Sequence, residues 1–496
     1  MRRRQASTAL GAVLALSVST VALAQPAPRL AVTHHVGHFN GQTVPYMATV
    51  AETFLHDAQG KPTASVITIA YTREGVGDPA GRPVLFAFNG GPGASSSPTH
   101  TQALGPMIRG EGSFADRSEQ ALHENPHSPL DAVDLVFIDP VGTGFSRPLP
   151  GVDPKPYYSV TGDALAVKGV IQDWLREHHR EGSPRYILGE SYGTTRAAAI
   201  IKNGKDLRVE GVMLVALVGG TPGREMPYVA SLPTMAAGAW YHQKIDRRGR
   251  SVEQVFDEAL EFARTEYVTA LIKGGSLPPT EKRRIAARMS ALIGLPAEFI
   301  EQHDLRISKN DWMFNVLKDK ALRTGLLDVT VTAPLEPGQD GAIDDPALGV
   351  VPKRAAGAPA GPPPTPDKIG PVPSPAVGTY LTNDLKFPST DTYIGVNFSV
   401  NAQWNYESRS NDFEALAAAM RADPKLRLFW AAGYYDLTTP AYAARYTLDQ
   451  AGVPASQLSA NYFPGPHGVY AGEANLKRFD DAVRAFVTAR GPEGSR

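Results

Sequence analysis

Six short apolar runs, each bounded by Gly, Pro or Asp, are spread along the chain. They are 83–91 (PVLFAFNGG), 133–140 (VDLVFIDP), 185–191 (RYILGES), 209–217 (VEGVMLVAL), 426–433 (LRLFWAAG) and 459–465 (SANYFPG). Runs this apolar predict strands buried on both faces, as in a parallel sheet. Residues 44–72 alternate apolar and polar positions instead, which predicts an antiparallel hairpin.

Helical periodicity fills the gaps between several of these runs. Residues 161–179 repeat apolar positions at helical spacing, with Thr161 as the expected N-cap. Residues 192–204 are rich in Ala and Ile and end at Gly204. Strands that alternate with helices predict an α/β sandwich with right-handed crossovers.

The segment 222–400 has a different character and predicts a mainly helical insertion over the sheet. It holds amphipathic helices at 251–274 and 280–294, and Ser308 and Asp311 form a capping box. Within it, nine prolines between positions 352 and 375 predict an exposed loop with neither helix nor sheet. The core then consists of two parts, 25–221 and 401–496.

The N-terminal segment 1–24 predicts an export signal. Arg2, Arg3 and Arg4 precede an apolar stretch that ends in Ala22-Leu23-Ala24, an A-x-A cleavage site. This stretch is short and rich in small residues, so we expect no stable membrane anchor. The chain has no cysteine, which suits a bacterial periplasmic or secreted protein held together by its core alone. We therefore expect a periplasmic or extracellular location.

Net charge bears on one class of partner. The 496 residues carry a formal charge of −1, which gives no electrostatic reason to expect nucleic acid. The sequence does not predict an oligomeric state.

Candidate chemistry begins at Gly189-Glu190-Ser191-Tyr192-Gly193, a G-x-S-x-G pattern where an apolar run meets a helical one. This context predicts a nucleophile elbow, a strained turn that lifts a serine hydroxyl above the sheet edge. A serine nucleophile needs a base and a group that orients the base, in the chain order Ser, Asp, His for this class of fold. Asp436 and His467 each follow one of the last two apolar runs, so Ser191, Asp436 and His467 form the predicted catalytic triad. This chemistry requires no metal and no organic cofactor.

A glycine-rich loop, Asn89-Gly90-Gly91-Pro92-Gly93, follows the first apolar run. Its glycines would let backbone N–H groups approach a substrate oxygen, and Tyr192 is the expected second donor. Alone, such a run indicates only a turn. A phosphate-binding loop would need a Lys and a Ser or Thr that are absent here.

Together these segments resemble the serine carboxypeptidases of the α/β-hydrolase fold. The shared motifs are NGGPGASS, DPVGTGFS, GESYG, GYYDLTTP and GPHG, in the family's order along nearly the whole chain. The resemblance implies an α/β-hydrolase fold with a mostly parallel sheet and a helical cap. It implies an oxyanion hole at Gly91 and Tyr192, and binding of the substrate's terminal carboxylate by Asn89, Gly90 and Glu190.

The implied activity is the release of C-terminal amino acids from peptides with a free C-terminus, through an acyl-enzyme. The chain departs from eukaryotic members at Ala94, where they usually have cysteine, and at Ala103, where they often have an acid. The departure at Ala103 bears on how the activity depends on pH.

Three other hypotheses remain open. An esterase or acyltransferase would use the same triad with a different pocket. An aminopeptidase of the proline-iminopeptidase type would share the Gly-Gly-Pro-Gly loop but needs acids that hold a free amine. A catalytically dead binding protein on this fold would have lost a triad member, and all three are present.

Overall fold

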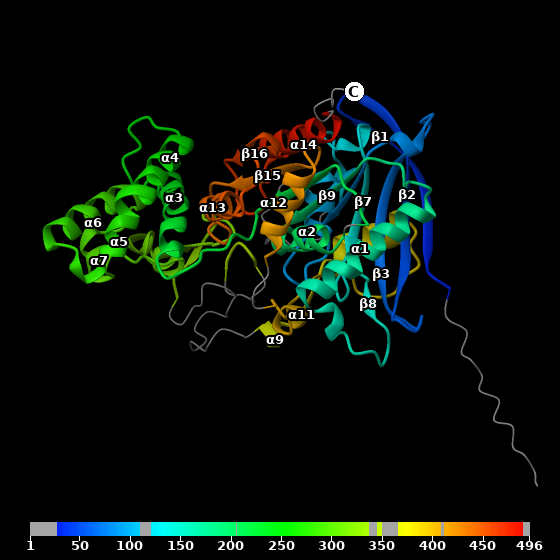
Figure 1. The fold of residues 1–496 in the computed structure, drawn as a ribbon, viewed down its shortest axis with the longest axis horizontal. Helices are drawn as coiled ribbons and strands as arrows, with labels where there is room; N and C mark the ends of the chain where they lie inside the picture. Colours follow the sequence, from blue (N-terminus) through cyan, green and yellow to red (C-terminus); the bar gives the residue numbers. More distant parts are fainter. Residues whose placement is uncertain are drawn as a thin grey trace, which may run out of the picture.

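The structure, a computed structural model, describes residues 27–109, 121–204, 206–336, 345–349, 366–407 and 411–489. The predicted export signal at 1–24 lies outside these residues. One mixed sheet runs through the core (Figure 1), in the order β1-β2-β3-β7-β4-β9-β10-β15-β16, with β8 paired to β3. Pairing is antiparallel from β1 to β7 and parallel from β7 to β16.

All six predicted apolar runs form strands of this sheet. The strands of the sheet are β1 (Leu30–Phe39), β2 (Gln42–His56), β3 (Pro62–Arg73), β4 (Val84–Phe88), β7 (Asp134–Asp139), β8 (Arg147–Pro148), β9 (Arg185–Glu190), β10 (Gly211–Val215), β15 (Arg427–Gly433) and β16 (Leu458–Phe463). The predicted hairpin is β2–β3, and β1 extends it by a third antiparallel strand.

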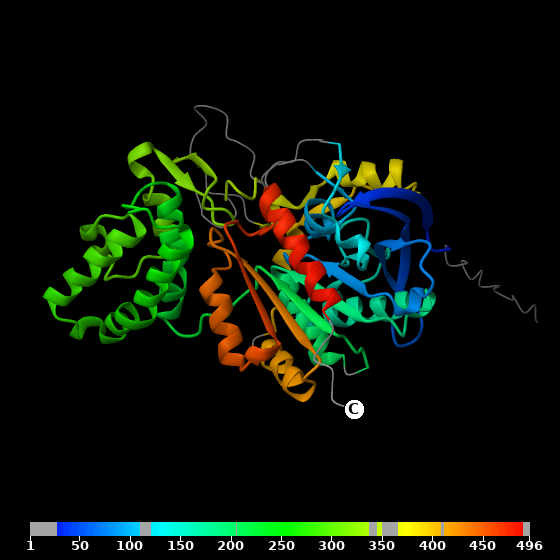
Figure 2. The ribbon, with the colours of Figure 1, turned by 90° about the horizontal axis from the view of Figure 1, so that it is seen from above.

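Helices cover both faces of the sheet (Figure 2). One face carries α1 (Val160–Glu177), α2 (Tyr192–Asn203), α12 (Asp412–Ala422) and α13 (Ala441–Ala451), and the other carries α14 (Glu473–Thr488). The prediction of Thr161 as the N-cap of α1 is wrong. Ser159 caps the helix because its hydroxyl accepts from Gly162 N at 3.1 Å, while the hydroxyl of Thr161 donates to Glu407.

A helical lobe projects from one end of the core (Figures 1 and 2, green). Its helices are α3 (Met226–Tyr241), α4 (Val252–Phe262), α5 (Val268–Lys273), α6 (Pro279–Ile293), α7 (Ala297–Gln302) and α8 (Lys309–Asn315). The hairpin β11 (Leu322–Thr324)–β12 (Thr332–Pro334) follows them. The capping box at Ser308 and Asp311 is confirmed at the start of α8.

The chain from 366 to 402 returns to the core. It forms α9 (Pro366–Ile369), β13 (Pro371–Pro373), α10 (Pro375–Thr379), β14 (Ile394–Asn397) and α11 (Phe398–Ala402). The prediction that 352–375 holds neither helix nor sheet is therefore wrong for 366–375; residues 352–365 lie outside the described part. Pro371 and Pro373 share one side of a strand in a two-stranded sheet, a position where a missing N–H is tolerated.

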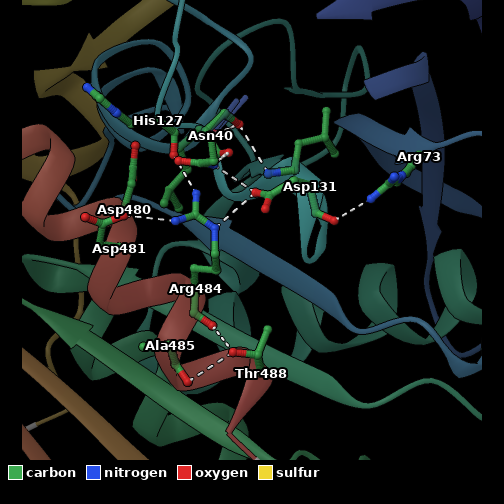
Figure 3. Close-up of polar contacts among 12 residues, drawn as sticks. Asn40, Arg73, His127, Asp131, Asp480, Asp481, Arg484, Ala485 and Thr488 are labelled. Carbon is green, nitrogen blue, oxygen red and sulfur yellow. Dashed lines mark hydrogen bonds and ion pairs between the residues drawn. The ribbon is translucent and has the colours of Figure 1, made fainter. Parts of the chain in front are cut away.

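An ion-pair network fixes α14 to the core (Figure 3). Arg484 Nε lies 3.1 Å from Asp131 Oδ1, and its Nη1 lies 2.9 Å from Asp481 Oδ1. Asn40 Nδ2 donates to the same Asp131 oxygen at 2.9 Å. The helix that follows the His467 loop is thus tied to the segment before β7 and, through Asp131, to the turn between β1 and β2.

A buried ion pair joins α1 to α2 beneath the loop that follows β4. Arg196 Nε lies 2.6 Å from Asp163 Oδ2, with side chains 1% and 4% exposed, and Arg196 Nη1 also donates to the Asn89 carbonyl. We expect Asp163→Asn to lower the free energy of unfolding by about 3–5 kcal/mol, because the guanidinium then stays buried without its carboxylate.

Urea unfolding would measure this loss. The exposed pair Arg445–Asp449 on α13 supplies the control, and Asp449→Asn should change stability by less than about 1 kcal/mol. Equal effects of the two variants would contradict the account.

Candidate active site

Ser191 lies at a strained turn between β9 and α2. Its backbone has φ +59 and ψ −129, outside the usual range for a residue other than glycine. A Cβ at Gly189 would lie 2.0 Å from the Gly193 carbonyl oxygen, and one at Gly193 would lie 3.0 Å from the Phe88 oxygen. The predicted strand–turn–helix is present, and it requires glycine at position 189 and leaves little room for a side chain at position 193.

Asp436 and His467 meet just beyond the ends of β15 and β16. His467 Nδ1 lies 2.7 Å from Asp436 Oδ2, and both side chains are buried. Thr438 N and Thr439 N donate to Asp436 Oδ1 at 2.9 and 3.0 Å. Burial raises the pKa of Asp436, but His467 and these hydrogen bonds outweigh it, so the pKa lies below its ordinary value.

The same pairing prepares His467 to accept a proton. Burial lowers the pKa of His467, and the charge of Asp436 outweighs burial and raises it above the ordinary value. Since Nδ1 faces Asp436, Nε2 is the nitrogen left for a substrate or nucleophile. Ser191 and His467 line one cavity, as the predicted triad requires.

A turn from the insertion braces both of these loops, and the sequence analysis did not find it. The Leu327 carbonyl accepts from His467 N at 2.8 Å, and the Leu326 carbonyl accepts from Leu437 N at 2.8 Å. Asp345 holds this turn, because its carboxylate accepts from Leu327 N and Ala347 N at 2.8 and 2.9 Å. These residues belong to no motif, and only the fold brings them to the triad.

The glycine-rich loop after β4 packs directly on the elbow. A Cβ at Gly90 would lie 2.3 Å from Tyr192 N, and Gly91 has φ +96, which favours glycine. The loop that holds Gly91 therefore approaches the backbone N–H of Tyr192. The backbone N–H groups of Gly91 and Tyr192 are the two donors predicted for an oxyanion hole.

Two further segments hold this loop in place. Asp139, at the end of β7, accepts from Ser96 N at 2.8 Å, and Asn397 N in β14 donates to the Gly93 carbonyl at 2.7 Å. The DPVGTGFS motif therefore supports the glycine-rich loop through Asp139. The contribution of β14 was not predicted.

Glu190 is a buried carboxyl next to the nucleophile. Tyr470 donates its hydroxyl hydrogen to Glu190 Oε2 at 2.9 Å, and the Asn89 side chain is also hydrogen-bonded to Glu190. Asn89 Oδ1 accepts from Thr99 N and its hydroxyl at 3.0 and 2.8 Å, so its amide nitrogen is the group that faces Glu190. Burial raises the pKa of Glu190 to about 7.

Tyr470 was missed because nothing in GPHGVY marks its hydroxyl as a partner of Glu190. At the position of the family's frequent second acid, Ala103 is buried and its carbonyl accepts from Asn125 Nδ2 at 2.6 Å. A tyrosine hydroxyl, not a second carboxyl, is thus the side chain that bonds Glu190 Oε2 here.

The cavity over Ser191 has a volume of about 340 Å³ and three walls. The core wall contains Asn89, Gly90, Gly91, Glu190, Ser191 and His467. The insertion contributes Lys309, Leu326, Leu327, Asp345 and Leu348, and the return segment contributes Val396, Phe398 and Asn401. Among the described residues, no group of three or more His, Asp or Glu side chains is placed to hold a metal ion.

The contact between Gly90 and the elbow generates a prediction. Gly90→Ala should reduce kcat/KM by at least about 100-fold, because its Cβ would displace Tyr192 N, the predicted donor to the oxyanion. Steady-state kinetics with an activated ester would measure the loss.

Gly220→Ala is the matched control, since nothing lies within 4 Å of its added Cβ, and it should keep parent activity. Parent activity in Gly90→Ala would contradict this role for the loop.

Comparisons with known proteins point to one family. Residues 71–214 match the family model described as serine carboxypeptidase. Serine carboxypeptidase-like 34 of Arabidopsis thaliana is 33% identical over 125 residues, 24% of this chain and 23% of that protein. Serine carboxypeptidase-like 21 of the same plant is 30% identical over 135 residues, 25% of this chain and 26% of that protein. The matched part of the chain therefore spans about a quarter of the length of these relatives.

A solved structure extends the comparison to the whole fold. Kex1, a prohormone-processing carboxypeptidase from Saccharomyces cerevisiae, aligns with a TM-score of 0.54 at 14% identity, over 89% of this chain and 90% of that chain. This likeness confirms the predicted fold class. Residues 71–214, with the glycine-rich loop and the elbow of Ser191, are thus similar to the serine carboxypeptidase family, and the chain as a whole has the α/β-hydrolase fold.

Proposed function

We propose that this protein is a serine carboxypeptidase that releases C-terminal amino acids from peptides through an acyl-enzyme. One observation carries the proposal: a buried carboxyl with a raised pKa, Glu190, shares a cavity with Ser191 and His467. A protonated Glu190 can donate a hydrogen bond to the terminal carboxylate of a peptide, and the amide of Asn89 can donate another.

The chemical steps use only side chains and backbone of this chain. Ser191 Oγ attacks the scissile carbonyl carbon while His467 Nε2 takes its proton, and Gly91 N–H and Tyr192 N–H stabilise the oxyanion. The C–N bond then breaks, and His467 gives the proton to the leaving amine. Water attacks the acyl-enzyme by the same route and restores Ser191.

Export is a separate part of the proposal. It is supported by the sequence of residues 1–24 and by the absence of cysteine. No helix in the described part of the chain is long and apolar enough to cross a membrane. We propose a periplasmic or extracellular location for the mature protein.

The nucleophile can be tested directly. Ser191→Ala should fold normally and lose activity on the order of 10⁶-fold, and a fluorophosphonate probe that labels the parent should not label this variant. Gel fluorescence and intact mass would read the labelling.

Ser459→Ala, on the exposed side of β16, is the serine control and should label like the parent. Labelling that persists in Ser191→Ala would move the nucleophile elsewhere.

The carboxylate site can be tested through the pH dependence of KM. Glu190 loses its proton as the pH rises through about 7, and it then repels the substrate carboxylate. For a peptide with a free C-terminus, KM should rise by about tenfold per pH unit above that value. The matched peptide amide brings no charge and should show no such rise. Glu190→Gln, which donates at any pH, should flatten the free-acid profile.

Tyr470→Phe should shift the pH at which KM begins to rise. The Tyr470 hydroxyl favours the ionised carboxylate of Glu190, so its removal should move the rise in KM to higher pH. The same pH dependence of KM for the acid and the amide in the parent would reject this role for Glu190 and favour an esterase.

A further inference from the structure

The insertion places one cation on the wall of the active-site cavity. Of the described residues that line this cavity, Lys309 is the one lysine or arginine. It is the first residue of α8, and its Nζ donates to the Thr438 carbonyl at 2.8 Å. Because an ammonium has three protons, this bond leaves two of them for a ligand in the cavity.

No carboxylate of the protein neutralises this ammonium within the part of the chain that the structure describes. The acid that acts on it electrostatically is Asp436, whose oxygens already accept from Thr438 N, from Thr439 and from His467. The other acid on the same wall, Asp345, uses both oxygens on backbone N–H groups. Burial lowers the pKa of Lys309 to about 8. A carboxylate from a substrate would supply the missing partner and would stabilise the charged ammonium.

The position of Lys309 indicates which residue of a peptide it meets. In the proposed function, Glu190 and Asn89 bind the terminal residue of the peptide. The other lining residues of the cavity are then left for the residue on the acyl side of the scissile bond. The wall of Val396, Phe398 and Asn401 has no charged side chain, whereas the insertion wall has Lys309.

We propose that Lys309 is a specificity-determining residue that favours peptides with an acidic side chain at the penultimate position. This inference rests on the proposed carboxypeptidase function and names its preferred substrate class. The carboxylate of a penultimate Glu or Asp accepts a charge-assisted hydrogen bond from Lys309 Nζ, and a neutral or basic side chain gains no such bond.

The test compares N-blocked dipeptides that end in Ala and carry Glu, Gln or Lys before it. In the parent, kcat/KM should be at least about tenfold higher for Glu than for Gln, and lowest for Lys. Lys309→Met keeps the aliphatic stem and should reduce the Glu-to-Gln ratio to near one, with the Gln substrate changed less than about threefold. Lys309→Arg should keep the preference.

Lys320→Met, an exposed lysine of the same lobe, is the control and should keep the parent ratio. The ratio is measured within one sample, so a partial loss of folded enzyme cancels, and Lys309→Gln is a second neutral variant if Lys309→Met does not fold. Equal rates for Glu and Gln in the parent, or a preference that survives both neutral variants, would overturn the proposal.

Methyl esters of the same blocked Glu and Gln residues separate this proposal from the carboxypeptidase proposal. Hydrolysis of the esters alone would reject carboxypeptidase activity, and the Glu-to-Gln ratio of the esters would still measure the role of Lys309. Absence of turnover on peptides and esters would overturn both.

Discussion

Backbone contact between the glycine-rich loop and the nucleophile elbow is the constraint on which the rest of the site depends. Any side chain at Gly90 would overlap Tyr192 N, and one at Gly189 would overlap the Gly193 carbonyl. This approach brings the backbone of Gly91 to the elbow and sets Asn89 beside Glu190. The proposed oxyanion hole and the proposed carboxylate site thus depend on the same backbone contact.

In this account the core carries out the chemistry, and the insertion determines which substrates are preferred. The core supplies the proposed reacting groups, on loops that follow the parallel strands β9, β15 and β16. The insertion supplies the brace of Leu326 and Leu327 for the triad loops, together with Lys309. A change of substrate preference can therefore arise in the insertion without disturbance of Ser191 or Glu190.

The sequence predicted the apolar strands of the sheet and the places of the proposed triad residues after them, because both have local signals. Apolar runs bounded by Gly or Pro gave all six strands, and Ser191, Asp436 and His467 each follow one of them. Tyr470, Asp345 and Asn397 were not predicted, since each acts through a contact that only the folded chain creates. Prolines 371 and 373 misled the prediction for 366–375, because their alternate positions fit an edge strand. Ser159, and not Thr161, is the N-cap of α1, because the backbone at Ser159 is extended and its hydroxyl reaches Gly162 N. The composition of the segment does not reveal this geometry.

The central claim is that the cavity recognises a free C-terminus beside a serine nucleophile. Time-resolved mass spectrometry of a ten-residue peptide and its C-terminal amide tests it most directly. The account predicts a ladder of products shortened one residue at a time from the C-terminus of the free acid, with the amide consumed far more slowly. Internal cleavage, release from the N-terminus, or equal consumption of both peptides would contradict it.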